Sequence, residues 1–296
     1  IREVSMFNFS GGKKIQFLVA LFLTFSTFEI SAQNTEFSKN VNNLAETDKK
    51  KNIRPNEENK ENELTLKKIE VYKQAIVKHP KNTLLYNNLG VAYSKLGNYD
   101  EALKVLKKGI EINPDLPSLH YNLGIVYDNL ELFPEAFKYV QKAVLMNGSN
   151  AEFRTEKCQL LVLMERYSES APCYEILVQL RELNAQESTN YGLSLLFNKQ
   201  KDQASAILEK NLELFPNESI AHNALGMFYF LTKKQKKSLP LFKKAVELDP
   251  TFDAARYNLA IVQLKEKDRE SAIKNYAFLK KTDSDYAAQL YKQKNN

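Results

Sequence analysis

The sequence predicts an all-α fold, a solenoid in which helical hairpins of one repeating type stack on one another. The chain has 296 residues, of which only 9 are Gly and 9 are Pro, and Trp is absent. Apolar and small residues recur at the spacing of one helical face, first from Tyr86 and again from Ala102. Leu123-Gly124 then repeats Leu89-Gly90 after 34 residues. A fixed period of this length indicates a repeat architecture.

The first element in the chain is an apolar segment. Lys13-Lys14 precede the uncharged run from Ile15 to Phe28, and Ala32 offers a small residue at its exit. This order predicts a secretory signal peptide over residues 6–32. An uncleaved anchor is the alternative, although a spanning helix needs about 20 apolar residues. We expect an exported protein, in a bacterial periplasm or secreted, with no stable membrane insertion after cleavage.

Two further segments precede the repeats. Residues 33–62 are rich in Asn and carry scattered apolar residues without a period. Such a segment buries too little apolar surface to offset its conformational entropy, which predicts a disordered linker. Residues 63–82 match only the second helix of a repeat, with Tyr72, Ala75 and Pro80 at the corresponding positions. We expect an N-terminal half-repeat helix that covers the first hairpin.

The repeats follow in register when Thr83 is taken as position 1. Position 8 is small in every repeat and position 24 is bulky, as in the pair Gly192 and Leu208. Because protein interiors are close-packed, a bulky side chain on one helix needs a gap on its partner. The predicted units are 83–116, 117–150, 151–184, 185–218, 219–252 and 253–286.

This pattern resembles the tetratricopeptide repeat (TPR) family. Leu89-Gly90, followed by Tyr93, Ala102 and Pro114 at fixed offsets, carries the resemblance. The resemblance implies a right-handed superhelical solenoid of stacked helix-turn-helix hairpins whose concave groove is lined by the first helix of each repeat. The unit 151–184 departs from the pattern, since no Pro or Gly ends its second helix near Glu182. Residues 285–296 are expected to form a C-terminal capping helix and tail.

Catalytic, cofactor and metal sites are not expected. The 3 His residues are scattered, and no phosphate-binding Gly loop or nucleophile motif occurs. A net charge of +6 with both signs interspersed favours a solvated surface over a nucleic-acid partner. The two cysteines, Cys158 and Cys173, fall in one repeat, so an exported protein could pair them; two buried thiols are the alternative.

A concave groove of this kind would offer two sets of side chains to a partner. Position 6 repeats Asn, whose carboxamide can both donate to and accept from a peptide backbone. The alternative is that Asn belongs to the average sequence of the family. Apolar residues of the C-terminal half would form side-chain pockets, or else belong to the core between repeats. The candidate binding residues are Asn88, Asn122, Asn190, Asn258, Leu193, Phe197, Met227, Phe230 and Tyr257.

The sequence therefore predicts a non-enzymatic, exported scaffold that binds an extended peptide or a partner protein. The alternative is an assembly element that forms a homo-oligomer through the apolar face of the groove.

Overall fold

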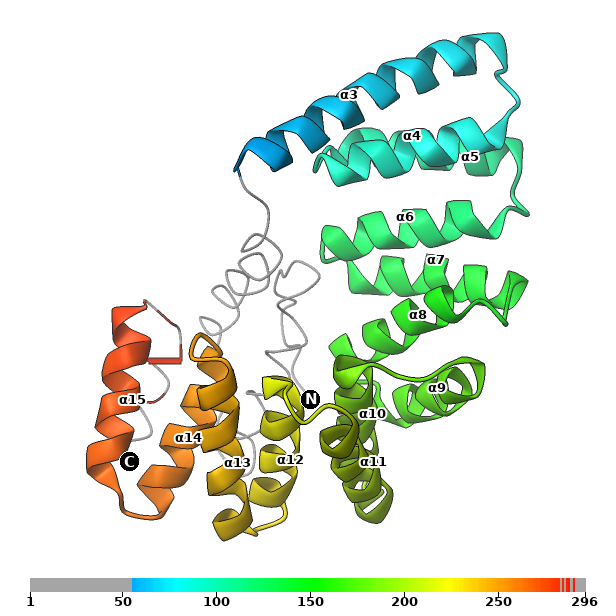
Figure 1. Cartoon of the computed structure of the whole chain (residues 1–296). Coiled ribbons are helices and arrows are strands. Elements are labelled where there is room, and N and C mark those ends of the chain that lie inside the picture. The colour runs from blue at the N-terminus through cyan, green and yellow to red at the C-terminus, as the bar shows by residue number, and fades with distance from the viewer. Residues whose placement is uncertain (1–54, 283, 285, 288–289, 291–296) are drawn as a thin grey trace, which may run out of the picture. The chain divides into compact units, whose positions relative to one another are not determined.

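The computed structural model describes residues 55–282, 284, 286–287 and 290. Within these residues the chain forms thirteen helices and no strand (Figure 1). They fall into two compact units, whose described parts are residues 55–164 and 165–290. The unit boundary lies in the turn of the third repeat, so this repeat contributes one helix to each unit. The fold is an all-α TPR-type solenoid, as the sequence predicts.

The first unit contains a single leading helix, two complete hairpins and the first helix of the third repeat. Each helix packs on the next along the chain, and α4 also contacts α6, the first helix of the following repeat. The helices are α3 (Pro55–Lys78), α4 (Thr83–Lys95), α5 (Tyr99–Ile112), α6 (Pro117–Asn129), α7 (Phe133–Met146) and α8 (Ala151–Leu163).

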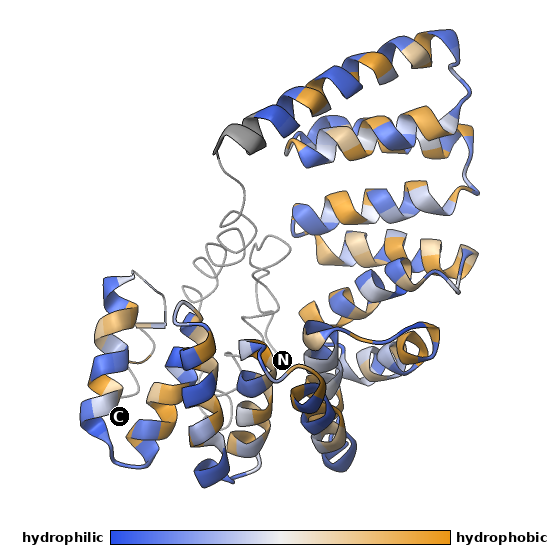
Figure 2. Ribbon diagram, viewed as in Figure 1, coloured by the Kyte–Doolittle hydropathy of each residue, from blue (hydrophilic) through white to orange (hydrophobic). Residues whose placement is uncertain are grey.

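The second unit continues the same alternation. First helices of neighbouring repeats contact one another here too, α10 with α12 and α12 with α14. The helices are α9 (Tyr167–Leu180), α10 (Ala185–Phe197), α11 (Lys201–Leu214), α12 (Ser219–Leu231), α13 (Gln235–Leu248), α14 (Asp253–Lys265) and α15 (Arg269–Lys281). Each 34-residue unit of sequence thus holds one pair of helices, with 13 residues in its first helix. Hydrophobic and hydrophilic residues alternate around the helices (Figure 2).

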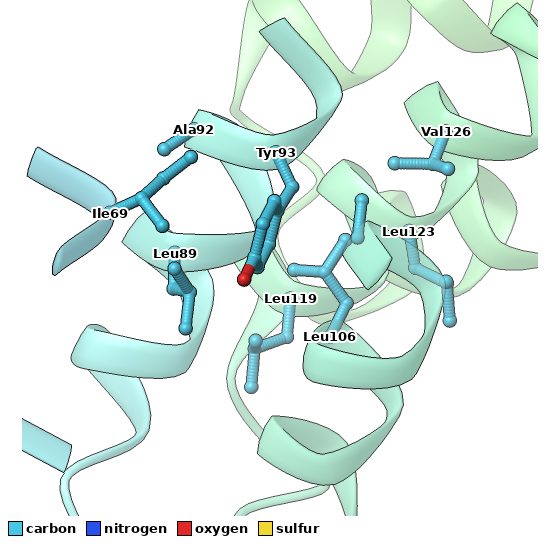
Figure 3. Packing of buried hydrophobic residues seen from close by; sticks show 9 residues of the cluster. Ile69, Leu89, Ala92, Tyr93, Leu106, Leu119, Leu123 and Val126 are labelled. Carbon is cyan, nitrogen blue, oxygen red and sulfur yellow. The ribbon is translucent and has the colours of Figure 1, made fainter. Parts of the chain in front are cut away.

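The leading helix α3 starts earlier than the sequence analysis expects. It begins at Pro55, so residues 55–62, assigned above to a disordered linker, are helical. Proline at a first helical position already lacks the N–H that a helix start leaves unpaired. Ile69 of α3 is buried in the core of the first unit beside Leu89 and Ala92 of α4 (Figure 3). The helix therefore covers the first hairpin.

Small residues at position 8 allow the two helices of a hairpin to approach closely, which confirms the predicted small–large pairing. A Cβ added to Gly192 would lie 2.5 Å from Cδ2 of Leu208, and one added to Gly226 would lie 2.8 Å from Cε1 of Phe242. Both partners stand at position 24 and are fully buried. At Gly192 and Gly226 any larger side chain would therefore displace the facing helix or its bulky residue.

Position 4 fixes the junction between one repeat and the next. Its side chain donates a hydrogen bond to the carbonyl oxygen six residues earlier, at the end of the preceding second helix. His120 Nε2 lies 2.7 Å from the Pro114 oxygen, and His222 Nε2 lies 2.8 Å from the Pro216 oxygen. Tyr86, Arg154 and Arg256 bond Pro80, Gly148 and Pro250 in the same way. These histidines have a structural role, because each satisfies a carbonyl that a helix end leaves open.

The fourth repeat lacks this bond and uses an ion pair instead. Arg181, just after α9, makes two hydrogen bonds to Glu187 of α10, at 2.6 and 2.8 Å. Glu187 also accepts from the backbone N–H of Asn184, whose side chain caps the Glu187 N–H in return. This reciprocal arrangement is a capping box. The capping box stabilises the N-terminus of α10. It follows α9, the second helix of the third repeat, which no Pro or Gly ends.

Residues 285–296, the expected C-terminal cap, lie mostly outside the described residues. Of them the structure describes Tyr286, Ala287 and Leu290, and all three are buried. The Tyr286 ring packs on Tyr257 of α14 with their centroids 5.2 Å apart. The predicted signal peptide over 6–32 and the linker up to residue 54 lie outside the described residues as well.

Candidate partner-binding surface

The position-6 asparagines lie on neighbouring first helices in the first unit and on first helices separated by α12 in the second. In the first unit they are Asn88 on α4 and Asn122 on α6; in the second they are Asn190 on α10 and Asn258 on α14. Ala224 holds the same position on α12. These residues share one position of their repeats, with a gap at α12 in the second unit.

Two of the four asparagines bond to the neighbouring repeat. Asn122 Nδ2 donates to Asn87 Oδ1 at 2.8 Å, and Asn258 Nδ2 donates to Asn223 Oδ1 at 2.9 Å. Both partners stand at position 5 of the preceding repeat, which makes the spacing one period plus one residue. This role was not predicted from the sequence. Two Asn pairs at a spacing of 35 were the signal that could have revealed it.

The other two asparagines differ in their surroundings. Asn88 is exposed. Asn190 is 1% exposed, and its Oδ1 accepts a 3.0 Å hydrogen bond from Gln186 Nε2 on the same helix. The opposite end of its carboxamide, Nδ2, has no hydrogen-bond partner.

Of the buried polar atoms on first helices of the second unit that lack a hydrogen-bond partner, three stand at position 5 or 6 of their repeats. They are Asn190 Nδ2, Asn258 Oδ1 and the Tyr257 hydroxyl. Both Tyr257 and Asn258 are fully buried, and this burial raises the pKa of the Tyr257 hydroxyl well above its usual range. A buried polar atom without a hydrogen bond destabilises a protein by about 1–3 kcal/mol. This set comprises an amide donor, a carbonyl acceptor and a hydroxyl that can act as either.

The apolar candidates of the second unit are mostly buried. Leu193, Met227, Phe230 and Tyr257 are at most 3% exposed. Phe197 is half-buried, with its ring 5.0 Å from that of Tyr167, and Lys265 Nζ lies 5.1 Å above the ring of Phe230. In the first repeat Val91, at the position of Leu193 and Met227, is 44% exposed.

Both cysteines are buried, and each is disulfide-bonded. Because the chain contains two cysteines, this bond joins Cys158 to Cys173. A count on unreduced protein that finds two free thiols would contradict it.

Other kinds of site find no support in the described part of the chain. No group of three or more His, Cys, Asp or Glu residues there could hold a metal ion. None of its helices combines the length and the apolar character that a membrane span needs.

Three family models match the chain. A model described as TPR repeat matches residues 92–130, and two described as tetratricopeptide repeat match residues 71–104 and 220–252. The matched segments lie in both units.

Curated relatives share only part of their length with this chain. Anaphase-promoting complex subunit 3 of Schizosaccharomyces pombe is 31% identical over 127 residues, which cover 42% of this chain and 18% of that protein. The peroxisomal targeting signal receptor of Candida albicans is 26% identical over 104 residues, covering 33% and 18%. The matched region thus spans less than a fifth of either relative.

Solved structures resemble the fold over more of the chain. A tetratricopeptide repeat protein from Parabacteroides merdae has a TM-score of 0.61 at 16% identity and covers 77% of this chain and 91% of its own. YrrB, described as a TPR protein with an unusual peptide-binding site, has a TM-score of 0.57 at 22% identity, covering 63% and 96%. At these identities the likeness shows the fold alone.

Proposed function

Because this chain belongs to the tetratricopeptide repeat family, we propose that it is a non-enzymatic scaffold that binds a peptide or partner protein along the first helices of its repeats. The observation that carries the proposal is the set of buried, unpartnered polar atoms on α10 and α14. These atoms stand at position 5 or 6, the register that lines the concave face in this family.

An extended polypeptide has the chemistry to satisfy these atoms. Asn190 Nδ2 would donate to a backbone carbonyl, and Asn258 Oδ1 would accept from a backbone N–H. Both contacts are to the backbone, so they bind a segment without selecting its sequence. Selection falls to accessible apolar side chains such as the half-buried Phe197, since Leu193 and Met227 are buried. Truncation of aromatic or long apolar side chains is the change that most often weakens such interfaces.

The relatives give independent support for an interaction role. One is a receptor for a targeting signal, one is a subunit of a complex, and one has a peptide-binding site in its description. All three names describe proteins that contact other polypeptides.

Substitution of Asn190 by Ala tests the proposal. Its Nδ2 bonds nothing in the structure, and the substitution removes one hydrogen bond, from Gln186 Nε2 to Asn190 Oδ1, so we expect only a small fall in the thermal midpoint. We expect weaker capture of crosslinked partners from an envelope fraction, by about three- to tenfold if one net hydrogen bond of about 1 kcal/mol is lost. Asn217→Ala, in an exposed turn, is the matched control. Equal capture by the Asn190→Ala variant and the control would contradict the proposal.

Self-association is the other outcome to be measured. If the protein forms a homo-oligomer through these helices, light scattering at micromolar concentration will give a multiple of the chain mass, and Asn190→Ala will lower it. A monomer leaves the first helices free for a partner.

We also propose that the protein is exported, on the strength of the apolar segment between Lys14 and Phe28. N-terminal sequencing of the protein from cells should find a start near Gln33. A start at or before Met6 in the mature protein would contradict export by signal cleavage.

A further inference from the structure

The positive charge of the chain is concentrated near its C-terminus. Residues 232–282 contain 13 basic and 6 acidic side chains, a net charge of +7, while the whole chain carries +6. The remaining residues are therefore close to neutral. An asymmetry of this size between parts of a chain is a sign of an interaction with an anionic partner.

Within this region the lysines gather on one face of α13. Lys236 and Lys243 are seven residues apart, as are Lys237 and Lys244, so each pair stands in line about 10 Å apart along the helix. The opposite face carries the buried residues Ser238, Phe242 and Ala245. We call Lys236, Lys237, Lys243 and Lys244 the lysine face.

Few acidic groups pair with the lysines of this face. Lys244 pairs with Glu247 at 2.8 Å, the one ion pair that the described residues form with the lysine face. Asp268, at the start of α15, also feels this charge: the Ser271 hydrogen bonds, with a smaller contribution from Lys243, lower the pKa of its carboxyl. Lys236, Lys237 and Lys243 are exposed. Their charge is available to a partner.

We propose that the lysine face of α13 is a second interaction surface, which docks an acidic polypeptide segment. This proposal goes beyond the function proposed above, because the lysine face lies on the second helix of a repeat. It shares no residue with the position-6 asparagines Asn88, Asn122, Asn190 and Asn258, which we call the asparagine row. Carboxylates placed at helical or extended spacing would meet two lysines about 10 Å apart.

A nucleic acid fits this surface less well than an acidic polypeptide. The nearest aromatic ring, that of Tyr229, has Lys234 Nζ at 5.9 Å and Lys237 Nζ at 5.2 Å, and its hydroxyl donates to Glu209 at 3.1 Å. A ring held in this way does not offer a face for base stacking. The lysine face also contains no arginine, the residue best suited to phosphate.

A membrane surface fits less well too. Large apolar side chains that insert into the interface accompany the basic residues of membrane-bound helices. Among the described residues, none of the exposed large apolar side chains lies on α13.

The test is a binding titration of the full chain with a fluorescent peptide of Glu and Ser, beside one in which Gln replaces Glu. We expect binding to the acidic peptide alone, and its loss when salt is raised to about 1 M, where charges are screened within about 3 Å. Lys236→Gln with Lys243→Gln should weaken it about three- to thirtyfold, the effect of losing two exposed charge pairs.

Lys201→Gln with Lys210→Gln is the matched control, since it removes the same charge from exposed lysines of α11 in the same unit. It should change the affinity by less than about twofold. Equal weakening by the two double variants would overturn the proposal, because total charge and not the lysine face would then drive binding. Tighter binding to vesicles of anionic lipid, or to duplex DNA, than to the acidic peptide would overturn it as well.

Discussion

Position 15, the residue that closes the turn of every hairpin, adopts a left-handed backbone. Its φ is +75° at Gly97, but the same conformation is taken by Lys199, Lys233 and three other residues that are not glycine. The left-handed region brings Cβ close to the following carbonyl, which destabilises a non-glycine residue by about 1–2 kcal/mol. The turn geometry imposes this conformation regardless of the side chain.

Replacing Lys199 by Gly should therefore stabilise the protein. We expect a gain of about 0.5–1 kcal/mol, because the removed strain exceeds the entropy that Gly loses on folding. Urea unfolding measures it. Lys201→Gly, which places the same residue inside α11, should instead lose up to about 1 kcal/mol. A Lys199→Gly variant no more stable than the wild type would show that the turn is unstrained.

His120 makes the stability of the chain depend on pH. It is 1% exposed, and its Nδ1 has no partner. Burial lowers the pKa of its imidazole below the usual 6.5; Lys142 adds a smaller contribution of the same sign, while the hydrogen bond to the Pro114 carbonyl and the charge of Asp115 oppose it. The folded state then binds fewer protons than the unfolded state, so stability is present above pH 6.5 and falls as the pH drops below it.

Urea unfolding at about pH 7.5 and about pH 5.5, on either side of the unperturbed histidine pKa, should show this loss. His120→Gln should flatten the dependence. His222→Gln is the control, since His222 makes the same bond to a proline carbonyl at a more exposed site. An unchanged pH dependence in His120→Gln would assign the effect to another group.

At the scale of the element, the start of α10 depends on the ion pair between Arg181 and Glu187. Glu187 is 2% exposed, and the hydrogen bond from Arg181 is the main reason that the pKa of the guanidinium is raised. The Arg181→Gln substitution leaves the Glu187 carboxylate buried with fewer hydrogen-bond donors. We expect a loss of about 2 kcal/mol, within the range for hydrogen bonds to charged groups.

A matched substitution separates burial from geometry. Arg166 also holds a glutamate, Glu169, at 2.6 and 2.7 Å, but this carboxylate is about half exposed. Arg166→Gln should lose less than about 1 kcal/mol, as exposed pairs do. Thermal unfolding compares the two variants. Equal losses would mean that the burial of Glu187 contributes nothing.

At the scale of the whole molecule, the periodicity of the sequence predicted how the helices pack, whereas individual residues did not reveal their hydrogen-bond partners. The small residue at Gly192 and the bulky one at Leu208 could be predicted to meet, because packing density acts wherever two helices cross. The bond from Asn258 to Asn223 could not, because a carboxamide serves a neighbouring repeat as well as a ligand. The start of α3 at Pro55 could not be predicted, because the polar, Asn-rich composition of this segment is typical of disorder, although its Glu and Lys residues favour a helix.

In a stacked array, stability is the sum of terms within repeats and terms between nearest neighbours. The bond between Asn223 and Asn258 belongs to the second kind, since it joins α12 to α14. A double-mutant cycle of Asn223→Ala and Asn258→Ala should therefore give a coupling free energy of about 0.5–1.5 kcal/mol.

The matched cycle pairs Asn190→Ala with Asn258→Ala, on α10 and α14. No hydrogen bond joins these two side chains, and α12 contacts both of their helices. Their effects on the free energy of unfolding should add to within about 0.5 kcal/mol. A coupling that is larger here than between Asn223 and Asn258 would mean that the asparagine row acts as one unit. Ligand binding could then not be assigned to Asn190 alone.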